Sequence, residues 1–299
     1  MSRNGWTLFG ALGAIWGVPY LLIKVATGGV TPAVLVCGRT SLGALILLPV
    51  ALAHRELAPV LARWKPLLAY TVVELLVPWY LLASAEQRLP SSLSALVVAA
   101  VPILGAVLAR TTGARERLGP ARLAGLATGA GGVAVLVGLD VHSTDLGAVA
   151  ELLAVVVGYS LGPWIFHRHL ADLPSVGVVV ASLLGCALFY APFAALELPS
   201  RVPSADVLLS IAGLGVLCTA TAFLVFFALI AEVGPARATV VTYVNPAVAV
   251  LAGVTVLHEP FAWSTALGFV LVLGGSLLAT RPYSPCQPVW ARRSARRAA

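Results

Sequence analysis

Two charged side chains inside long apolar runs are the residues of this chain best placed to do chemistry. Arg39 and Glu74 each lie about eight residues inside such a run, or about 12 Å along a helix that rises 1.5 Å per residue. If they enter a hydrocarbon core of about 30 Å from opposite faces, their levels differ by roughly 6 Å. Charges at that depth are costly in lipid and are usually functional. We therefore predict that both face one interior cavity.

Two interpretations of this pair remain open. In the functional one, Arg39 holds the carboxylate of a substrate, and Glu74 binds a cation or a coupling proton. In the structural one, the two side chains form a buried ion pair, or Arg39 caps backbone carbonyls.

Prolines and aromatic residues occur at the same depth. Prolines inside the runs free a backbone carbonyl and are expected to kink the helix; they are Pro19, Pro78, Pro102, Pro163 and Pro246. Such breaks usually face protein or water rather than lipid. Next to them, the side chains best suited to binding an organic solute are Trp16, Trp79, Tyr80, Tyr243 and Asn245. The alternative for each aromatic residue is simple packing, whereas Asn245, ahead of a proline at mid-run, is the strongest polar candidate.

Other polar residues have plainer explanations. Lys24 lies near the end of the first run, where its amine can snorkel to the lipid headgroups. Glu116 and Glu259 each precede an apolar run, so we expect them to be acids at the positive start of the helix that follows. His167 and His169 could hold a metal, but an interfacial, solvated pair is the plainer interpretation.

Motifs for catalysis, cofactors and metals are missing from the sequence. The four cysteines are scattered without a metal-ligand or CxxC spacing. The two lysines, Lys24 and Lys65, lie outside any glycine-rich loop, which excludes a P-loop. We therefore expect no catalytic residue, no cofactor and no metal site.

The composition identifies the elements that must position these residues. Only 10% of the residues are charged and 60% are hydrophobic, whereas a soluble domain carries roughly 25% charged residues. Ten runs are long enough to cross a bilayer: 6–26, 31–53, 66–85, 91–109, 121–138, 146–166, 175–196, 207–231, 236–257 and 262–280. Because lipid offers no partner for an open strand edge, these runs must be helices. The chain is predicted to be an all-α integral membrane protein with ten transmembrane helices.

Lysine and arginine predict its orientation. One set of alternate connections and tails holds Arg3, Arg55, Arg63, Lys65, Arg110, Arg115, Arg117, Arg122, Arg168, Arg237, Arg281, Arg292, Arg293, Arg296 and Arg297, and the other set holds only Arg88 and Arg201. The positive-inside rule therefore places both termini in the cytoplasm, in a multi-pass protein of the cell membrane. The net charge of +7 thus reflects topology, and we expect no nucleic-acid partner.

The chain is also one unit written twice. Three pairs of residues repeat at an offset of 143: Pro49 with Pro192, Glu116 with Glu259, and Gly125 with Gly268. The repeats cover residues 6–138 and 146–280, and the basic tail, 281–299, is expected to be disordered in the cytoplasm. Since each half holds five spans, an odd number, the second half must enter the membrane in the opposite direction. Inverted repeats are typical of secondary transporters.

A family resemblance follows from particular residues. The segment Ala14-Ile-Trp-Gly17, then Arg39 with Ala44-Leu45 and Pro49, and the two Pro…Glu…Gly blocks resemble the EamA domains of the drug/metabolite transporter superfamily. The resemblance implies two inverted five-helix EamA repeats and export of small metabolites or drugs, often amino acids. The second copy departs from the first, since Tyr159-Ser160 replaces Trp16-Gly17 and Ser182 replaces Arg39. Any site between the halves is therefore asymmetric.

The expected function is secondary transport by alternating access around a site between the halves. The partners are then a small-molecule substrate, the lipid bilayer and, if transport is coupled, H⁺; uniport is equally allowed. The alternative is a membrane-embedded, lipid-modifying enzyme, which would need a cluster of His, Asp or Glu at a membrane face, and the sequence contains none. Substrate, transport direction and oligomeric state stay open at this point.

Overall fold

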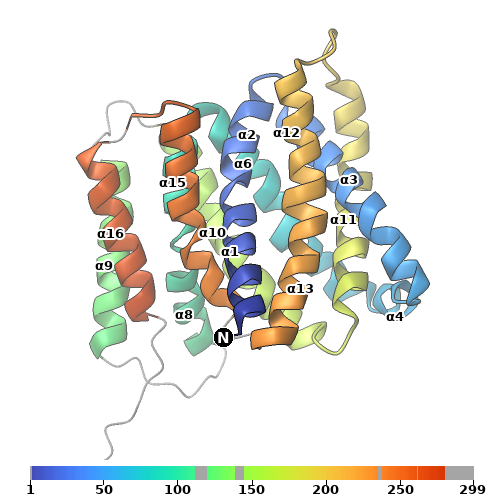
Figure 1. Cartoon of the computed structure of the whole chain (residues 1–299), viewed down its shortest axis with the longest axis horizontal. Helices are drawn as coiled ribbons and strands as arrows, with labels where there is room; N and C mark the ends of the chain where they lie inside the picture. The colour runs from blue at the N-terminus through green and yellow to red at the C-terminus, as the bar shows by residue number, and fades with distance from the viewer. Residues whose placement is uncertain (1, 112–119, 139–144, 235–237, 261, 280–299) are drawn as a thin grey trace, which may run out of the picture.

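Long apolar helices dominate the computed structural model, which describes residues 2–111, 120–138, 145–234, 238–260 and 262–279 (Figure 1). Six helical segments are long and apolar enough to cross a membrane, and three of them are single helices: α3 (Pro32–Ala53), α10 (Leu146–His169) and α11 (Ser175–Leu196). The segment Arg3–Thr27 consists of α1 (Arg3–Gly17) and α2 (Pro19–Thr27). The other two each contain a π-helical turn: Trp64–Arg88 consists of α5 (Trp64–Tyr70), the turn η1 (Thr71–Leu76) and α6 (Val77–Arg88), and Ala205–Val233 consists of α12 (Ala205–Gly215), the turn η2 (Val216–Thr221) and α13 (Ala222–Val233). A short helix, α4, spans Leu57–Ala62.

Four shorter apolar segments complete the bundle. They are α7 (Ser91–Val98) with α8 (Val101–Thr111), α9 (Pro120–Gly138), the 3₁₀ turn η3 (Thr239–Tyr243) with α15 (Asn245–Val256), and α16 (Trp263–Ala279). Each of the ten segments overlaps one of the ten predicted runs. Helices are the regular elements throughout the described ranges, so the prediction of an all-α membrane protein is confirmed.

The two halves of the chain run through the bundle in opposite directions. The helix α1 starts at the end of the bundle marked N in Figure 1, called here the near end, and α2 finishes at the opposite, far end. The helix α10, which opens the second half, starts at the far end, where its N-cap residue Asp145 meets Arg88 at the end of α6. The predicted inversion of the second repeat is therefore visible in the course of the chain.

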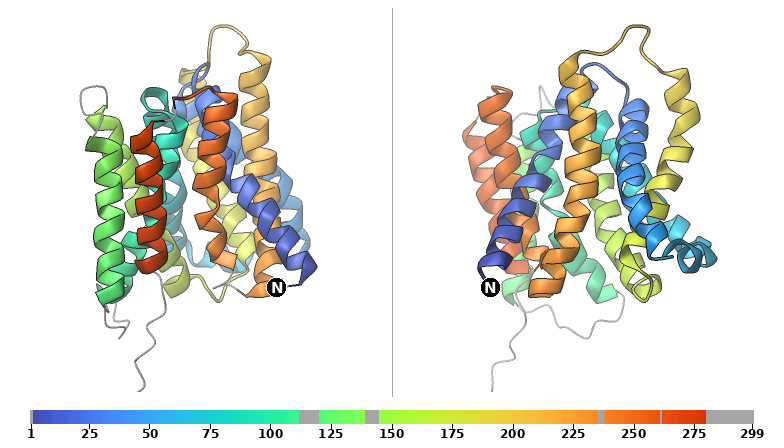
Figure 2. Two further views of the ribbon diagram at one scale, coloured as in Figure 1. Left: turned by 60° about the vertical axis from the view of Figure 1, so that its left-hand side comes forward. Right: turned by 45° about the vertical axis from the view of Figure 1, so that its right-hand side comes forward.

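Helices of one half pack against helices of the other half. The helix α3 packs on α11, α6 on α10, and α9 on α16, and the views of Figure 2 show the last pair at one edge of the bundle. At Gly275 of α16 an added Cβ would meet backbone atoms of Gly129 and Gly125 in α9. Because none of these glycines has a side chain, these two backbones can approach closely.

Helix breaks also repeat between the halves. The third and eighth spans each contain a π-helical turn, η1 and η2. The fourth and ninth spans are each interrupted just before a proline, Pro102 and Pro246, and the first is interrupted before Pro19. Pro78 directly follows η1, so four of the five expected breaks are present. At Pro163 no such break is present, because α10 continues through it, and the expected kink there stays a prediction.

Two predictions fall on residues that lie outside the described ranges. They are the role of Glu116 and the state of the basic tail, 281–299. Both stay predictions.

Candidate functional site

Arg39 lies where three spans meet in the interior. It is carried by α3 and its side chain is almost fully buried, with the residue 7% exposed. The guanidinium carbon is 3.6 Å from the ring centre of Trp79 on α6, and Nε donates a hydrogen bond of 3.2 Å to Oγ1 of Thr219 in η2. Among the described residues, the recorded ion pairs do not include Arg39. The charge is thus held by an aromatic face and a hydroxyl.

The local backbone explains why Thr219 can reach Arg39. The hydroxyl of Thr219 donates to the carbonyl of Leu214, five residues back, as the wide π-helical turn allows. Its oxygen is then free to accept from Arg39. A Cβ at Gly43 would collide with the Thr219 side chain, and one at Gly215 would meet Leu42 and the Arg39 carbonyl. Glycine at both positions therefore brings α3 against the end of α12 and η2.

Two tyrosines complete the surroundings of Arg39. Tyr159 on α10 lies near the Arg39 guanidinium. Tyr20 on α2 lies near both Tyr159 and Arg39. The side chain of Trp79 also lies near the hydroxyl of Tyr159. The sequence places both tyrosines near the proline breaks, but neither was among the side chains judged best suited to bind a solute. The available signal was the replacement of Trp16-Gly17 by Tyr159-Ser160 in the second repeat, which marks the position as one where the two copies differ chemically.

Glu74 faces a different neighbour from the one expected. It lies in η1, and its carboxyl packs against α10 so closely that a Cβ at Gly162 would collide with it. Its Oε2 atom is buried without a hydrogen-bond partner. The structure does not form the expected Arg39–Glu74 pair. The acid that interacts electrostatically with Arg39 is Glu86 instead.

Glu86 is the main residue that sequence reasoning missed. It lies in the last turn of α6, fully buried, and both of its carboxylate oxygens lack a hydrogen-bond partner. The predicted third run ended at residue 85, which assigned Glu86 to a connection. A usable signal was its position seven residues after Trp79, since residues seven apart lie on the same face of a helix.

Lys24 does not extend to the lipid headgroups. Its Nζ donates to the carbonyl oxygens of Glu86 and Leu89, at 2.6 and 2.9 Å. These carbonyls end α6 and have no partner within that helix, and a cation at a helix C-terminus is favourable. The snorkelling explanation is therefore wrong, because the helix end lies within reach of the amine.

The remaining predicted residues lie in separate surroundings. Trp16 packs on Phe226, with ring centres 4.9 Å apart, and Tyr80 is 37% exposed and stacked on Tyr190. The hydroxyl of Tyr243 donates to the carbonyl of Ser276 at 3.4 Å, and the Oδ1 atom of Asn245 is buried without a hydrogen-bond partner. Of the seven predicted site residues, Arg39 and Trp79 are in direct contact with each other.

Comparison with known proteins identifies the fold. A sequence profile of the EamA-like transporter family matches residues 4–138 and again residues 147–281. The chain belongs to the EamA-like transporter family. The double match confirms the two-repeat architecture and the resemblance found in the sequence. Membership points to membrane transport rather than to an enzyme.

Named relatives and a solved structure agree with this assignment. The chain is 29% identical to the uncharacterized inner membrane transporter YedA of Escherichia coli K12 over 94% of both proteins. It is 24% identical to the uncharacterized transporter YvbV of Bacillus subtilis, over 87% of this chain and 86% of the relative. A crystal structure with 22% sequence identity superposes with a TM-score of 0.65 over 98% of this chain and 99% of the other, and shows the same fold.

At the far end, Glu259 joins the two EamA repeats. Its carboxylate accepts hydrogen bonds from the backbone N–H groups of Ser91 and Ser92, at 2.7 and 3.0 Å. These are the first amides of α7, so the acid lies at the positive start of a helix in the other repeat. The prediction that it serves the helix following it is therefore wrong. Burial opposes ionisation of Glu259, but the hydrogen bonds from Ser92 and Ser91 outweigh it and lower the pKa of the carboxyl.

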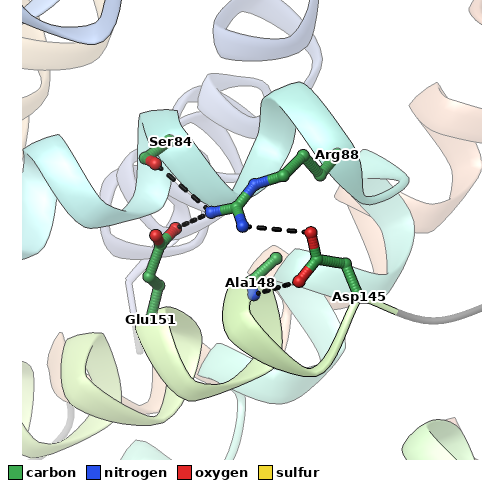
Figure 3. Close-up of polar contacts among 5 residues, drawn as sticks. All are labelled: Ser84, Arg88, Asp145, Ala148 and Glu151. Atoms are coloured by element: carbon green, nitrogen blue, oxygen red, sulfur yellow. Dashed lines mark hydrogen bonds and ion pairs between the residues drawn. The ribbon is translucent and has the colours of Figure 1, made fainter.

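Ion pairs join the EamA repeats at both ends. At the far end, Arg88 of α6 contacts Asp145 at 3.0 Å and Glu151 at 2.6 Å (Figure 3). The N–H of Ala148 and the Arg88 guanidinium hold the pKa of Asp145 below its usual range. At the near end, Arg63 and Asp172 form two parallel hydrogen bonds, each of 2.7 Å. That arginine lowers the pKa of Asp172.

Proposed function

We propose that this chain is a secondary transporter of the cell membrane that exports small organic solutes carrying a carboxylate and an apolar part. Membership of a transporter family supports transport, and so do the names of both relatives; the name of YedA, an inner membrane transporter, supports the location. The excess of lysine and arginine on one set of connections supports cytoplasmic termini. The near end of the bundle is then the cytoplasmic end.

One observation carries the proposal for the solute. Arg39 is a buried cation without a carboxylate partner among the residues that the structure describes. A buried charge that is incompletely paired costs several kcal/mol, and an incoming carboxylate offsets that cost. Guanidinium and carboxylate match as two parallel hydrogen bonds. Arg39 therefore selects a carboxylate, such as that of a hydrophobic amino acid.

The walls around Arg39 suit the rest of such a solute. Trp79, Tyr159 and Tyr20 offer aromatic faces with polar tips, which bury an apolar group and still hydrogen-bond. The buried acceptor of Asn245 and the half-buried carboxyl of Glu74 are further groups able to contact a solute or a cation.

Alternating access requires the two repeats to move against each other. The π-helical turns in spans three and eight and the proline breaks in spans four and nine are matched weak points of the helices. The far-end contacts of Arg88 and Glu259 and the near-end pair of Arg63 with Asp172 connect the repeats at opposite ends. Rocking opens one set of contacts while the other is kept.

The test uses purified protein in proteoliposomes and a matched pair of solutes. We expect counterflow of L-phenylalanine, or of another apolar amino acid in a panel, but not of the corresponding amine that lacks the carboxylate. The substitution R39S should lower the solute affinity by about 10- to 150-fold, because a charged hydrogen bond of about 1.5–3 kcal/mol is lost. The control R201S changes an exposed arginine in the connection 197–204 and should have no effect.

Two results would contradict the proposal. Equal flux of the acid and its amine would remove the carboxylate from the recognition. Absence of flux for the whole panel, together with a change in lipid composition on expression of the chain, would favour the alternative of a lipid-modifying enzyme.

A further inference from the structure

The carboxyl of Glu86 is the least compensated polar group in the described part of the chain. The residue is 0% exposed, and neither oxygen has a hydrogen-bond donor. An ionised carboxylate in such surroundings is strongly disfavoured, and it takes up a proton or a cation instead. Intramembrane acids of this kind mark ion or proton pathways in transporters.

Several charged or titratable groups surround this carboxyl, but they are occupied elsewhere. Those that face it from neighbouring elements are Lys24 and Tyr20 on α2, Arg39 on α3, Tyr159 on α10 and Glu259 from the connection before α16. Lys24 donates to the backbone carbonyls of Glu86 and Leu89, and Arg39 is held by Trp79 and Thr219. On the same helix, Arg88 is engaged by Asp145 and Glu151.

The position of Lys24 makes it a reserve partner. Its ammonium is 2.6 Å from the backbone oxygen of the residue whose carboxyl lacks a donor. A change in side-chain rotamer can move that ammonium from the end of α6 to the carboxylate, since lysine is flexible and has three donors. Water entering from the far end could serve the same carboxylate. The group therefore has one environment that favours the neutral acid and another that favours the anion.

We propose that Glu86 is a proton-binding site of this transporter, protonated in the arrangement described here and ionised when Lys24 or water reaches its oxygens. In the exchange, the O–H bond of the carboxyl breaks, the proton passes to water, and Lys24 keeps its own charge and offsets that of the carboxylate. Binding of the proton is independent of the proposed function, whereas its coupling to a solute depends on it.

The coupling to the solute site has a definite sign. Glu86 lies about 10 Å along the helix from Trp79, the residue beneath the Arg39 guanidinium. At this separation and an effective dielectric constant near 20, an ionised Glu86 weakens the binding of a carboxylate at Arg39 on the order of tenfold. Since linkage is reciprocal, the solute anion and the proton favour each other and travel together. Export then follows the gradient of the solute itself and carries a proton outward.

The first test measures protonation directly and needs no transported solute. Infrared difference spectra of the purified full-length protein after a pH jump should show a band of a protonated carboxyl that is missing in E86Q. The control E197Q removes an exposed glutamate and should keep the band. If E86Q does not fold, E86D decides the matter. A band that is shifted in E86D assigns the proton to residue 86. A band that is unmoved in E86D, or one that is lost in E74Q, overturns the assignment.

The second test measures coupling in proteoliposomes. An imposed gradient of one pH unit should drive up to about tenfold accumulation of L-phenylalanine on the alkaline side in the wild type, and about none in E86Q. Wild-type accumulation that ignores the pH gradient overturns the coupling, and stabilisation by sodium in place of a protonated carboxyl overturns the proton site. Absence of solute flux in every protein contradicts the proposed function alone, because the infrared test still reports on Glu86.

Discussion

The close approach of α9 and α16 leads to a sharp prediction for stability. A Cβ at Gly275 would lie against the backbone nitrogen of Gly129, 2.6 Å from its Cα and 2.7 Å from the carbonyl oxygen of Gly125. Backbone atoms cannot turn aside as a flexible side chain can. Carbon atoms need about 3.5–4.0 Å between them, so G275A forces the two helices apart by roughly 1 Å.

The neighbouring glycine provides a matched control. A Cβ at Gly274 meets nothing within 4 Å, so G274A makes the same chemical change in the same helix without a clash. Overpacking of this kind costs about 1–3 kcal/mol, which is a difference of about 5- to 150-fold in the unfolding equilibrium between the two variants. Alanine also favours helix over glycine by about 1 kcal/mol, so G274A should be neutral or slightly stabilising.

The assay is reversible unfolding of the purified protein in mixed micelles, followed by the loss of helical circular dichroism. We expect G275A to unfold at a lower denaturant concentration than both the wild type and G274A. Equal unfolding free energies for G275A and G274A would falsify the close contact between Gly275 and α9.

Four further predictions concern the polar contacts. E259Q should lower the thermal stability at neutral pH, because it weakens the contact with the start of α7. The pKa of Glu259 is lowered in the folded protein, so this contribution is present above the usual glutamate pKa of about 4.3 and is lost as the pH falls below it. The melting temperatures of E259Q and the wild type should therefore converge in acid. R63Q and D172N should each shift the balance of the bundle toward opening at the near end, seen as faster labelling of a cysteine introduced there, and the double variant should add nothing to either single one. R39S should lose affinity for carboxylate solutes, as measured by counterflow. E86Q should lose the protonated-carboxyl band in the infrared spectrum.

The course of the spans was predictable because lipid imposes it. Apolar runs of sufficient length must be helices in a bilayer, and the matched runs of the two halves therefore appear in the sequence. Proline marked four breaks correctly, since it removes a backbone donor wherever it occurs. The effect of Pro163 was not predictable from its type alone. Neighbouring helices can satisfy the carbonyl that a proline frees, and α10 stays continuous.

The contacts within the site were less predictable, because they depend on which way each helix face points. Depth alone suggested that Arg39 and Glu74 would meet. The π-helical turn η1, however, contains Glu74 and departs from the 3.6-residue period on which such an estimate relies. Hydropathy likewise ended the third run at residue 85, whereas the surrounding helices bury Glu86 completely. Burial of a single polar residue by other spans is a tertiary effect, and a hydropathy pattern does not contain it.

The repeat itself supplies an internal control for the role of Arg39. Its counterpart in the second half is Ser182, which is buried on α11 and whose hydroxyl accepts a hydrogen bond of 2.9 Å from Thr71 in η1. Arg39 likewise contacts a hydroxyl group in a π-helical turn of the other repeat, that of Thr219 in η2. The contact between α11, the second span of the second repeat, and the π-helical turn η1 of the first repeat is thus made by two hydroxyl groups.

A serine is therefore sufficient for packing at this place, and the fold does not require a buried guanidinium there. R39S gives residue 39 the residue type that its counterpart Ser182 has in the second repeat. We expect this variant to keep the unfolding temperature of the wild type, or to raise it, since a buried charge without a full partner is removed. Its solute affinity should fall at the same time. A large loss of stability in R39S would instead mean that the cation is part of the packing, and the carboxylate site would lose its main support.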